Sequence, residues 1–226
     1  MNKQVFLFLF AVSFLFAQNT KAQGNQNTAT GNQTNQNTSN QDAKTIPGFD
    51  SIAWGTPYET VKERFRVLAR SEDAKDPVEI LRDVPEREIL IKRRGIYYRY
   101  LFYKTPEKAK VQDSQQTIAD NQKDQNPARF FFVSSEFDLV PAEMLYEKLK
   151  QKYGNRTGST LDKNQRGAYI WEGEKGFLLQ WLEPYQQKPY TRKLYYISKE
   201  IREQIKKDYE AYMSYRELKA IDSLLP

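Results

Sequence analysis

The sequence predicts an α+β fold in which an antiparallel sheet carries helices packed on one face. Segments with the period-two alternation of strands come in two blocks, and a segment with helical spacing precedes each block. A third, long helical segment ends the chain. Because strands that follow one another directly form hairpins, this order favours antiparallel pairing over the alternating strands and helices of a parallel sheet. The repeated order also indicates a duplicated helix-plus-three-strand unit.

The first helix is predicted over residues 57–70, after an extended lead-in over 46–55. Thr56 is expected to cap this helix, and Pro57 suits its first position, where an amide hydrogen would be unpaired. Glu59 follows Thr56 at the spacing of a capping box. The apolar stripe of the helix consists of Val61, Phe65 and Leu68.

The strands of the first block alternate apolar and polar residues or are rich in β-branched and aromatic side chains. They are predicted over 78–82, 88–92, 96–103 and 129–136. A polar insertion at about 105–127 separates the last two strands, and its length and composition predict disorder.

The second block follows the same plan. A helix is predicted over 141–153, with Gly154 as its stop. Ser198 is expected to cap a long, charged helix that reaches about residue 224. The segments between the two helices are predicted as strands over 168–172, 177–182 and 193–197, a hairpin turn at 172–176 and a loop at 184–189.

The first 45 residues predict export of the protein. Residues 1–22 have a positive start, an apolar stretch and small residues before a cleavage point, which is the layout of a signal peptide. The apolar stretch is shorter than the roughly 20 residues of a membrane-spanning helix, so an uncleaved anchor is the lesser alternative. Residues 23–45, rich in Asn, Gln and Thr, predict a disordered spacer, with an adhesive or glycan-bearing tract as the alternative.

Residues 46–226 are then long enough for a single domain with its own core. No second apolar stretch approaches spanning length, so no transmembrane segment is expected after cleavage of the signal peptide. The mature protein is expected in the periplasm, on the cell surface or secreted.

The composition excludes several classes of function. The chain contains no cysteine and no histidine, which removes disulfides, thiolate nucleophiles, imidazole-based triads and the usual zinc sites. No calcium loop or glycine-rich phosphate loop is found, so we expect no metal and no cofactor. The formal net charge of +6 is mild, and no nucleic-acid-binding module is recognisable, so we expect no nucleic-acid partner.

Residues 49–62, with the sequence FDSIAWGTPYETVK, resemble a motif of exported bacterial proteins of unknown function in which a short strand ending in Trp-Gly runs into a helix. The leader and spacer are similar to those of leptospiral-type envelope proteins. The plan of elements is distantly similar to the small lipoprotein of the outer-membrane assembly machine, from which the chain departs by its length and by lacking a lipid-bearing cysteine. The resemblance implies a fold and an envelope location, and it brings no catalytic residues. The motif residues are Trp54, Gly55, Thr56, Pro57, Glu59 and Val61.

Aromatic side chains are the main candidates for ligand contact, because exposed rings stack on sugars and anchor protein interfaces. Core packing is the alternative for each of them. The candidates on the later strands are Trp171, Trp181, Tyr185 and Tyr195. On the strand over 96–103, one face is formed by Tyr98, Tyr100 and Phe102. Basic spots that could hold acidic polymers, with solvated surface charge as the alternative, are formed by Arg64, Arg66, Lys92, Arg93 and Arg94.

Two carboxylate pairs, Glu136 with Asp138 and Glu172 with Glu174, are the remaining route to hydrolysis. A glycosidase holds its two carboxylates across a cleft, which sequence neighbours seldom do. We therefore predict an exported, non-enzymatic binding or envelope-structural protein that contacts an envelope protein, a host protein or a polysaccharide. The alternatives are a surface-displayed adhesin for host matrix proteins and a carboxylate-dependent glycan or wall hydrolase.

Overall fold

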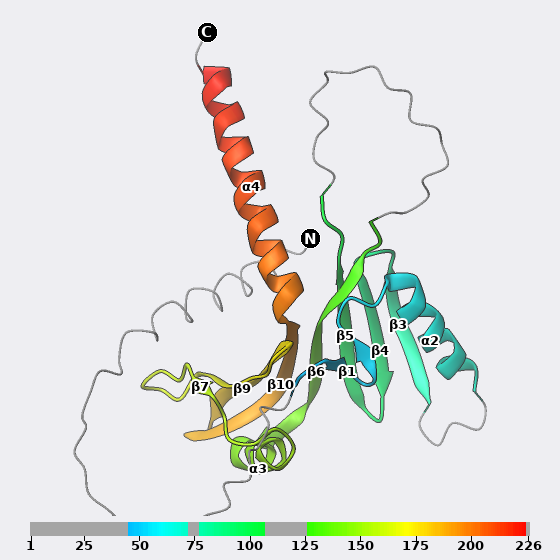
Figure 1. Ribbon diagram of the computed structural model, residues 1–226. Helices are drawn as coiled ribbons and strands as arrows, with labels where there is room; N and C mark the ends of the chain where they lie inside the picture. Colours follow the sequence, from blue (N-terminus) through cyan, green and yellow to red (C-terminus); the bar gives the residue numbers. More distant parts are fainter. Residues whose placement is uncertain (1–44, 72–76, 107–125, 225–226) are drawn as a thin grey trace, which may run out of the picture. The chain divides into compact units, whose positions relative to one another are not determined.

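The computed structural model describes residues 45–71, 77–106 and 126–224, with side chains up to residue 211 (Figure 1). The predicted signal peptide over 1–22, nearly all of the predicted spacer and most of the predicted insertion lie outside the described residues.

The described residues form an α+β fold with three helices and an eight-stranded antiparallel sheet, as the sequence predicts (Figure 1). The helices are α2 (Tyr58–Arg70), α3 (Ala142–Tyr153) and α4 (Lys199–Leu224). In spatial order the strands of the sheet are β3 (Val78–Val84), β4 (Glu88–Arg93), β5 (Ile96–Tyr103), β6 (Arg129–Pro141), β10 (Lys188–Ser198), β9 (Gly176–Tyr185), β8 (Gly167–Glu172) and β7 (Gly158–Ser159). A separate hairpin pairs β1 (Gly48–Phe49) with β2 (Ile52–Ala53).

The order of elements repeats once along the chain. Helix α2 is followed by β3, β4, β5 and β6, and helix α3 is followed by β7, β8, β9 and β10. The first strand of each half lies at an outer edge of the sheet, and the last strands, β6 and β10, pair with each other at its centre. Each half thus has four strands, as predicted for the first block, whereas three were predicted for the second. The predicted repeat of one helix and three strands is therefore wrong by one strand. The additional strand of the second half is β7, whose two residues are too short to show alternation.

Helices α2 and α3 cover one face of the sheet, which we call the helix face. From α2, Val61 and Phe65 are buried, and the Phe65 ring lies 4.8 Å from the ring of Tyr100 on β5. From α3, Leu149 enters the same core, as does Trp171 of β8. The core therefore fills the space between the two helices and the sheet.

Helix α4 packs against the face of the sheet opposite to the helix face. Successive strand residues alternate between faces, so Phe177 points opposite to its neighbour Leu178, a member of the helix-face core. Arg202 of α4 lies over the Phe177 ring, 5.5 Å from its centre. Ile201 and Ile205 are buried at the start of α4. The amide of Ile201 donates to the Ser198 hydroxyl at 3.3 Å, which confirms the predicted cap.

The predicted capping box at the start of α2 is wrong. The Thr56 hydroxyl donates to the carbonyl of Ala53 at 2.8 Å, no side chain caps the helix, and Glu59 is exposed. Pairing with β6 is the physical reason. The amide of Phe130 donates to the Thr56 carbonyl at 2.9 Å, and the Tyr58 amide donates to the Ala128 carbonyl at the same distance. The Ala128 carbonyl of the sheet side thus accepts a bond from one of the first amides of the helix, which have no partner within the helix.

The rest of the predicted Trp-Gly motif positions this entry to the helix. The Trp54 indole donates to the Ile46 carbonyl at 2.7 Å, and its ring lies 5.0 Å from the ring of Phe130. Gly55 has a φ of 84°, a left-handed backbone that glycine adopts without steric cost. Its amide donates to the Phe130 carbonyl at 2.8 Å. Pro57 occupies the cap position before α2.

The predicted loop at 184–189 is also wrong, because β9 and β10 continue through it as one hairpin. Pro184 and Pro189 lie directly opposite each other, next to the closing pair of Tyr185 and Lys188. In a two-residue hairpin the closing pair exchanges hydrogen bonds and the next pair does not, so two prolines fit there without losing a bond. The turn itself is made by Gln186 and Gln187, with φ of 48° and 63°.

Two other predicted chain reversals are confirmed. The amide of Gly173 donates to the Gly176 carbonyl at 2.9 Å, which closes the turn between β8 and β9. Helix α3 ends at Gly154, whose φ is 80° and whose amide donates to the Lys150 carbonyl at 2.8 Å.

Candidate functional site

A groove opens on the helix face between the β1–β2 hairpin, helix α3 and the strands below them. It consists of two adjoining pockets of about 560 and 480 Å³ that share the rings of Phe49, Tyr98 and Tyr196. We call the two pockets together the central groove. The first pocket is also lined by residues that include Asp50, Arg93, Tyr100, Lys152 and Tyr153, and the second by residues that include Arg94, Ile96, Phe137, Asp138, Val140, Met144, Leu145 and Lys148.

The hairpin inserts Phe49 between the two pockets. The Phe49 ring lies 4.7 Å from the ring of Tyr196 and 5.6 Å from that of Tyr98. The hairpin pairs with no strand of the large sheet, so these ring contacts fix its tip in place of a strand ladder. At Gly48 an added Cβ would lie 1.9 Å from the Ile52 carbonyl oxygen, so only glycine permits so close an approach of the two chains.

Two arginines hold the tip of the hairpin. Arg64 of α2 donates to the carbonyls of Asp50 and Ser51 at 2.8 and 3.3 Å. Arg93 of β4 donates to the Asp50 carboxylate at 3.0 Å. Both tip residues have positive φ, 48° at Asp50 and 61° at Ser51. Such a conformation costs energy in a non-glycine residue, so the arginine contacts offset strain at the edge of the groove.

Two buried tyrosines that line the groove, Tyr100 and Tyr196, keep their protons at physiological pH. Burial raises the pKa of Tyr196 well above its usual value, and a hydrogen bond with Tyr153 adds to the shift. Burial likewise raises the pKa of Tyr100. These two rings are almost fully buried, so they form the base of the groove and bring no negative charge to it.

Cations outnumber carboxylates around the groove. The basic side chains that line it are those of Arg93, Arg94, Lys148 and Lys152, against the carboxylates of Asp50 and Asp138. Met144 of α3 lines the second pocket with 59% of its surface exposed. A flexible methionine beside an aromatic floor is typical of surfaces that bind protein side chains.

Of the aromatic residues predicted from sequence, Trp171 belongs to the core. It is 2% exposed, its indole donates to the Gly154 carbonyl at 2.9 Å, and its ring packs on Tyr146 of α3. The fully enclosed ring offers no surface to a ligand. Its alternation with the neighbouring buried Ile170 places the two side chains on opposite faces of β8.

The other three predicted aromatics lie on the face opposite to the groove. Trp181 and Tyr195 are half-buried there, and burial raises the pKa of Tyr195 to about 12. Tyr185 is 53% exposed and meets the ring of Tyr190 edge-on, with 5.8 Å between the ring centres. The structure thus brings Tyr185 together with Tyr190, near the tip of the β9–β10 hairpin.

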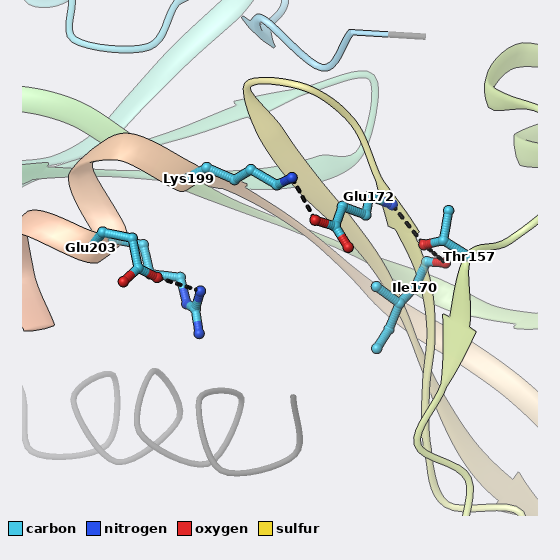
Figure 2. Close-up of polar contacts among 6 residues, drawn as sticks. Thr157, Ile170, Glu172, Lys199 and Glu203 are labelled. Atoms are coloured by element: carbon cyan, nitrogen blue, oxygen red, sulfur yellow. Dashed lines mark hydrogen bonds and ion pairs between the residues drawn. The ribbon is translucent and has the colours of Figure 1, made fainter. Parts of the chain in front are cut away.

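The carboxylate pairs are held in separate environments. Glu172 forms an ion pair with Lys199 at the start of α4, and its amide donates to the Thr157 hydroxyl at 2.9 Å (Figure 2). Its predicted partner Glu174 lies in the turn between β8 and β9 and is exposed. Glu172 therefore ties β8 to α4, which is a structural role.

In the other pair, Glu136 lies 3.7 Å from Lys193 of β10, whereas Asp138 lines the second pocket of the groove. A register irregularity between β6 and β10 follows Glu136, so Glu136 and Asp138 do not share one face of the strand as expected.

A polar cluster that sequence reasoning missed joins α2 to β3. The Tyr58 hydroxyl donates to the Asp83 carboxylate, and the Lys62 ammonium donates to the Tyr58 hydroxyl at 3.1 Å and to Asp83 at 2.9 Å. Burial and the bond to Asp83 raise the pKa of Tyr58, and the bond to Asp83 raises the pKa of Lys62. Partial burial acts against ionisation of Asp83, but the bonds from Tyr58 and Lys62 outweigh it and lower the pKa of Asp83.

These shifts are the reverse of those that activate a tyrosine base or a lysine nucleophile, which require a lowered pKa. The cluster thus holds α2 against the sheet. The one sequence signal for it is the spacing of Tyr58 and Lys62, one helical turn apart.

Sequence reasoning noted the tyrosines of β5 and the basic residues of the β4–β5 turn separately, and the groove brings both together with α3. Within the described ranges, no group of three or more Asp, Glu, His or Cys residues could hold a metal ion. A search of the same ranges finds no helix with the length and apolarity needed to cross a membrane. Comparison with known proteins shows that the chain matches no protein-family model, no curated protein and no solved structure.

Proposed function

We propose that the chain is an exported, non-enzymatic binding module that holds a segment of a protein partner in the central groove. The observation that carries the proposal is the aromatic floor between two pockets of about 560 and 480 Å³, formed by the half-buried rings of Phe49 and Tyr98 and the buried ring of Tyr196. Ligand sites in proteins are concave, largely apolar and supplied with a few polar groups, and this groove has those features.

The lining favours binding over chemistry. Asp50 is engaged by Arg93, and the buried tyrosines keep their protons because their pKa values are raised. A hydrolase would need a second carboxylate opposite Asp138, and Glu136 is paired with Lys193 instead.

The second pocket favours protein over polysaccharide. Its walls include the aliphatic side chains of Ile96, Val140 and Leu145, with Met144 at the rim. Aliphatic walls offer no hydrogen bonds to sugar hydroxyls, whereas they pack well against apolar side chains of a peptide. An adhesin for host matrix proteins would use the same groove and differ in its location on the cell.

A photo-crosslinking residue placed at Met144 tests the proposal in cells that express the full chain. Val67 of α2 provides the matched control, because both side chains are 59% exposed and Val67 is not among the groove residues. We expect a discrete, protease-sensitive adduct from position 144 and none from position 67. Equal adducts from both positions, or none from either, would refute a binding groove. An adduct that glycan-degrading enzymes remove and proteases do not would assign the groove to polysaccharide.

Export is tested separately by sequencing the amino terminus of the mature protein and by cell fractionation. A new amino terminus close to Gln23 outside the cytoplasm is expected. Recovery of the unprocessed chain from the cytosol would remove export from the proposal and leave the groove untouched.

A further inference from the structure

We infer that the partner segment bound in the central groove is acidic and presents an aromatic side chain next to a carboxylate. This inference rests on the proposed function and names the chemistry of the partner. The argument comes from the chain itself, because one half of the groove already holds a pair of this kind.

The internal pair is Phe49 with Asp50. The Phe49 ring packs on the rings of Tyr98 and Tyr196, and the adjacent carboxylate of Asp50 accepts a hydrogen bond from Arg93 at 3.0 Å. The floor of the groove therefore binds an aromatic ring, and a nearby cation, Arg93, binds the carboxylate of the next residue.

The second pocket repeats these two features on the other side of the shared rings. Phe137 and Leu145 form apolar walls next to Tyr98 and Tyr196. Lys148 of α3 lines this pocket, is exposed, and forms no ion pair or hydrogen bond with any residue that the structure describes. A partner ring in this pocket would place its adjacent carboxylate near Lys148.

Charge favours the same partner. Arg94 and Lys148 line the second pocket together with one carboxylate, Asp138, so the pocket has a net positive charge. An exposed rim charge of this kind steers an oppositely charged partner and weakens with salt. A neutral or basic peptide would gain nothing from Lys148.

Direct binding of short synthetic peptides to the purified chain tests the inference. The probe is a fluorescently labelled peptide with the repeat Glu-Phe-Asp, and the two comparison peptides replace each Phe by Ala or each acidic residue by Lys. The protein variants are Lys148→Glu and, as the matched control, Lys207→Glu on α4. Both substitutions change the net charge equally, because each replaces a lysine by a glutamate. Lys207 is exposed and lies outside the groove, so only Lys148→Glu changes the charge of the pocket. Peptide variants leave the fold of the protein intact.

We expect the Glu-Phe-Asp peptide to bind, with an affinity that falls at high ionic strength. The Ala and Lys peptides should bind at least about tenfold more weakly, since each lacks the ring or the charge. Lys148→Glu should weaken binding about fivefold or more, and Lys207→Glu by less than about twofold. Equal binding of all three peptides, or equal effects of the two protein variants, would overturn the inference. No peptide binding together with a specific crosslink from position 144 would overturn the inference alone, whereas loss of that crosslink would overturn the proposed function.

Discussion

The turn between β9 and β10 offers a sharp test of the structure, because Gln186 and Gln187 both have left-handed backbone conformations. A two-residue hairpin turn of type I′ needs positive φ at both central positions, and glycine or asparagine usually supplies it. Substitution Gln187→Gly should therefore stabilise the fold. Gln187 is exposed, so the substitution removes little packing.

The magnitude follows from two opposing terms. A left-handed conformation costs a non-glycine residue roughly 1–2 kcal/mol. Glycine loses about 0.5–1 kcal/mol more entropy on folding. The net expectation is a gain of about 0.5–1 kcal/mol, or a rise of roughly 1–4 °C in the melting temperature for a domain of this size.

Urea unfolding of the full chain, followed by tryptophan fluorescence, measures this change. Lys188→Gly is the matched control, because Lys188 is the next residue, is exposed and lies in strand β10. Glycine there should lower stability by about 0.5–1 kcal/mol, since the extended backbone gains nothing from it. Opposite signs for the two variants are expected with an unchanged urea dependence. If both variants changed the free energy of unfolding in the same direction, the left-handed turn would be refuted and the loop predicted from the sequence would be favoured.

Three further predictions concern the helix face. Phe65→Ala should lower the free energy of unfolding by about 3–5 kcal/mol because Phe65 is fully buried, whereas Val67→Ala, at an exposed position, should change it by less than about 0.5 kcal/mol. Urea titration compares the two variants, and equal effects would contradict the assigned face of α2. The lowered pKa of Asp83 means that its ionised form stabilises the fold at neutral pH, and this contribution is lost as acid protonates the carboxylate. Asp83→Asn should therefore flatten the acidic side of a curve of unfolding free energy against pH, and an unchanged curve would count against the cluster. Gly176→Ala would place a Cβ 2.8 Å from the Ile46 carbonyl oxygen and from the Trp54 indole nitrogen, so it should destabilise the fold and speed hydrogen exchange of the indole, and a wild-type exchange rate would refute that contact.

Much of the fold follows from local pattern. The strand β5, rich in aromatic residues, the apolar spacing of α2 and the glycine stop of α3 are each encoded within a few residues, and the structure confirms them. The class and the antiparallel sheet then follow, because blocks of successive strands leave few other arrangements. The capping error lies where a distant segment supplied the hydrogen bonds, as β6 does at the start of α2. The error at 184–189 is local, because two prolines fit opposite each other in a hairpin where no hydrogen bond is lost.

The candidate site could be predicted only in fragments. Tyr98 and Tyr100 of β5 share a face by their spacing, and the basic residues at 93 and 94 lie at the end of β4 and directly after it. Their meeting with Phe49, Met144 and Lys148 depends on segments almost 100 residues apart in the chain, which no local period encodes. Trp171 shows the reverse case, because a ring on a strand looks the same in sequence whether a helix covers it or not.

The amino-acid sequence by itself determined the three helices, the seven longer strands, the repeat of helix and strands, and the absence of thiol and imidazole chemistry. Tertiary structure alone decided that β6 and β10 pair at the centre of the sheet, and that a hairpin sits with Phe49 between two pockets. The physical reason is the range of the forces involved. Backbone conformation responds to neighbouring residues, whereas a groove exists only after long-range strand pairing has brought its walls together.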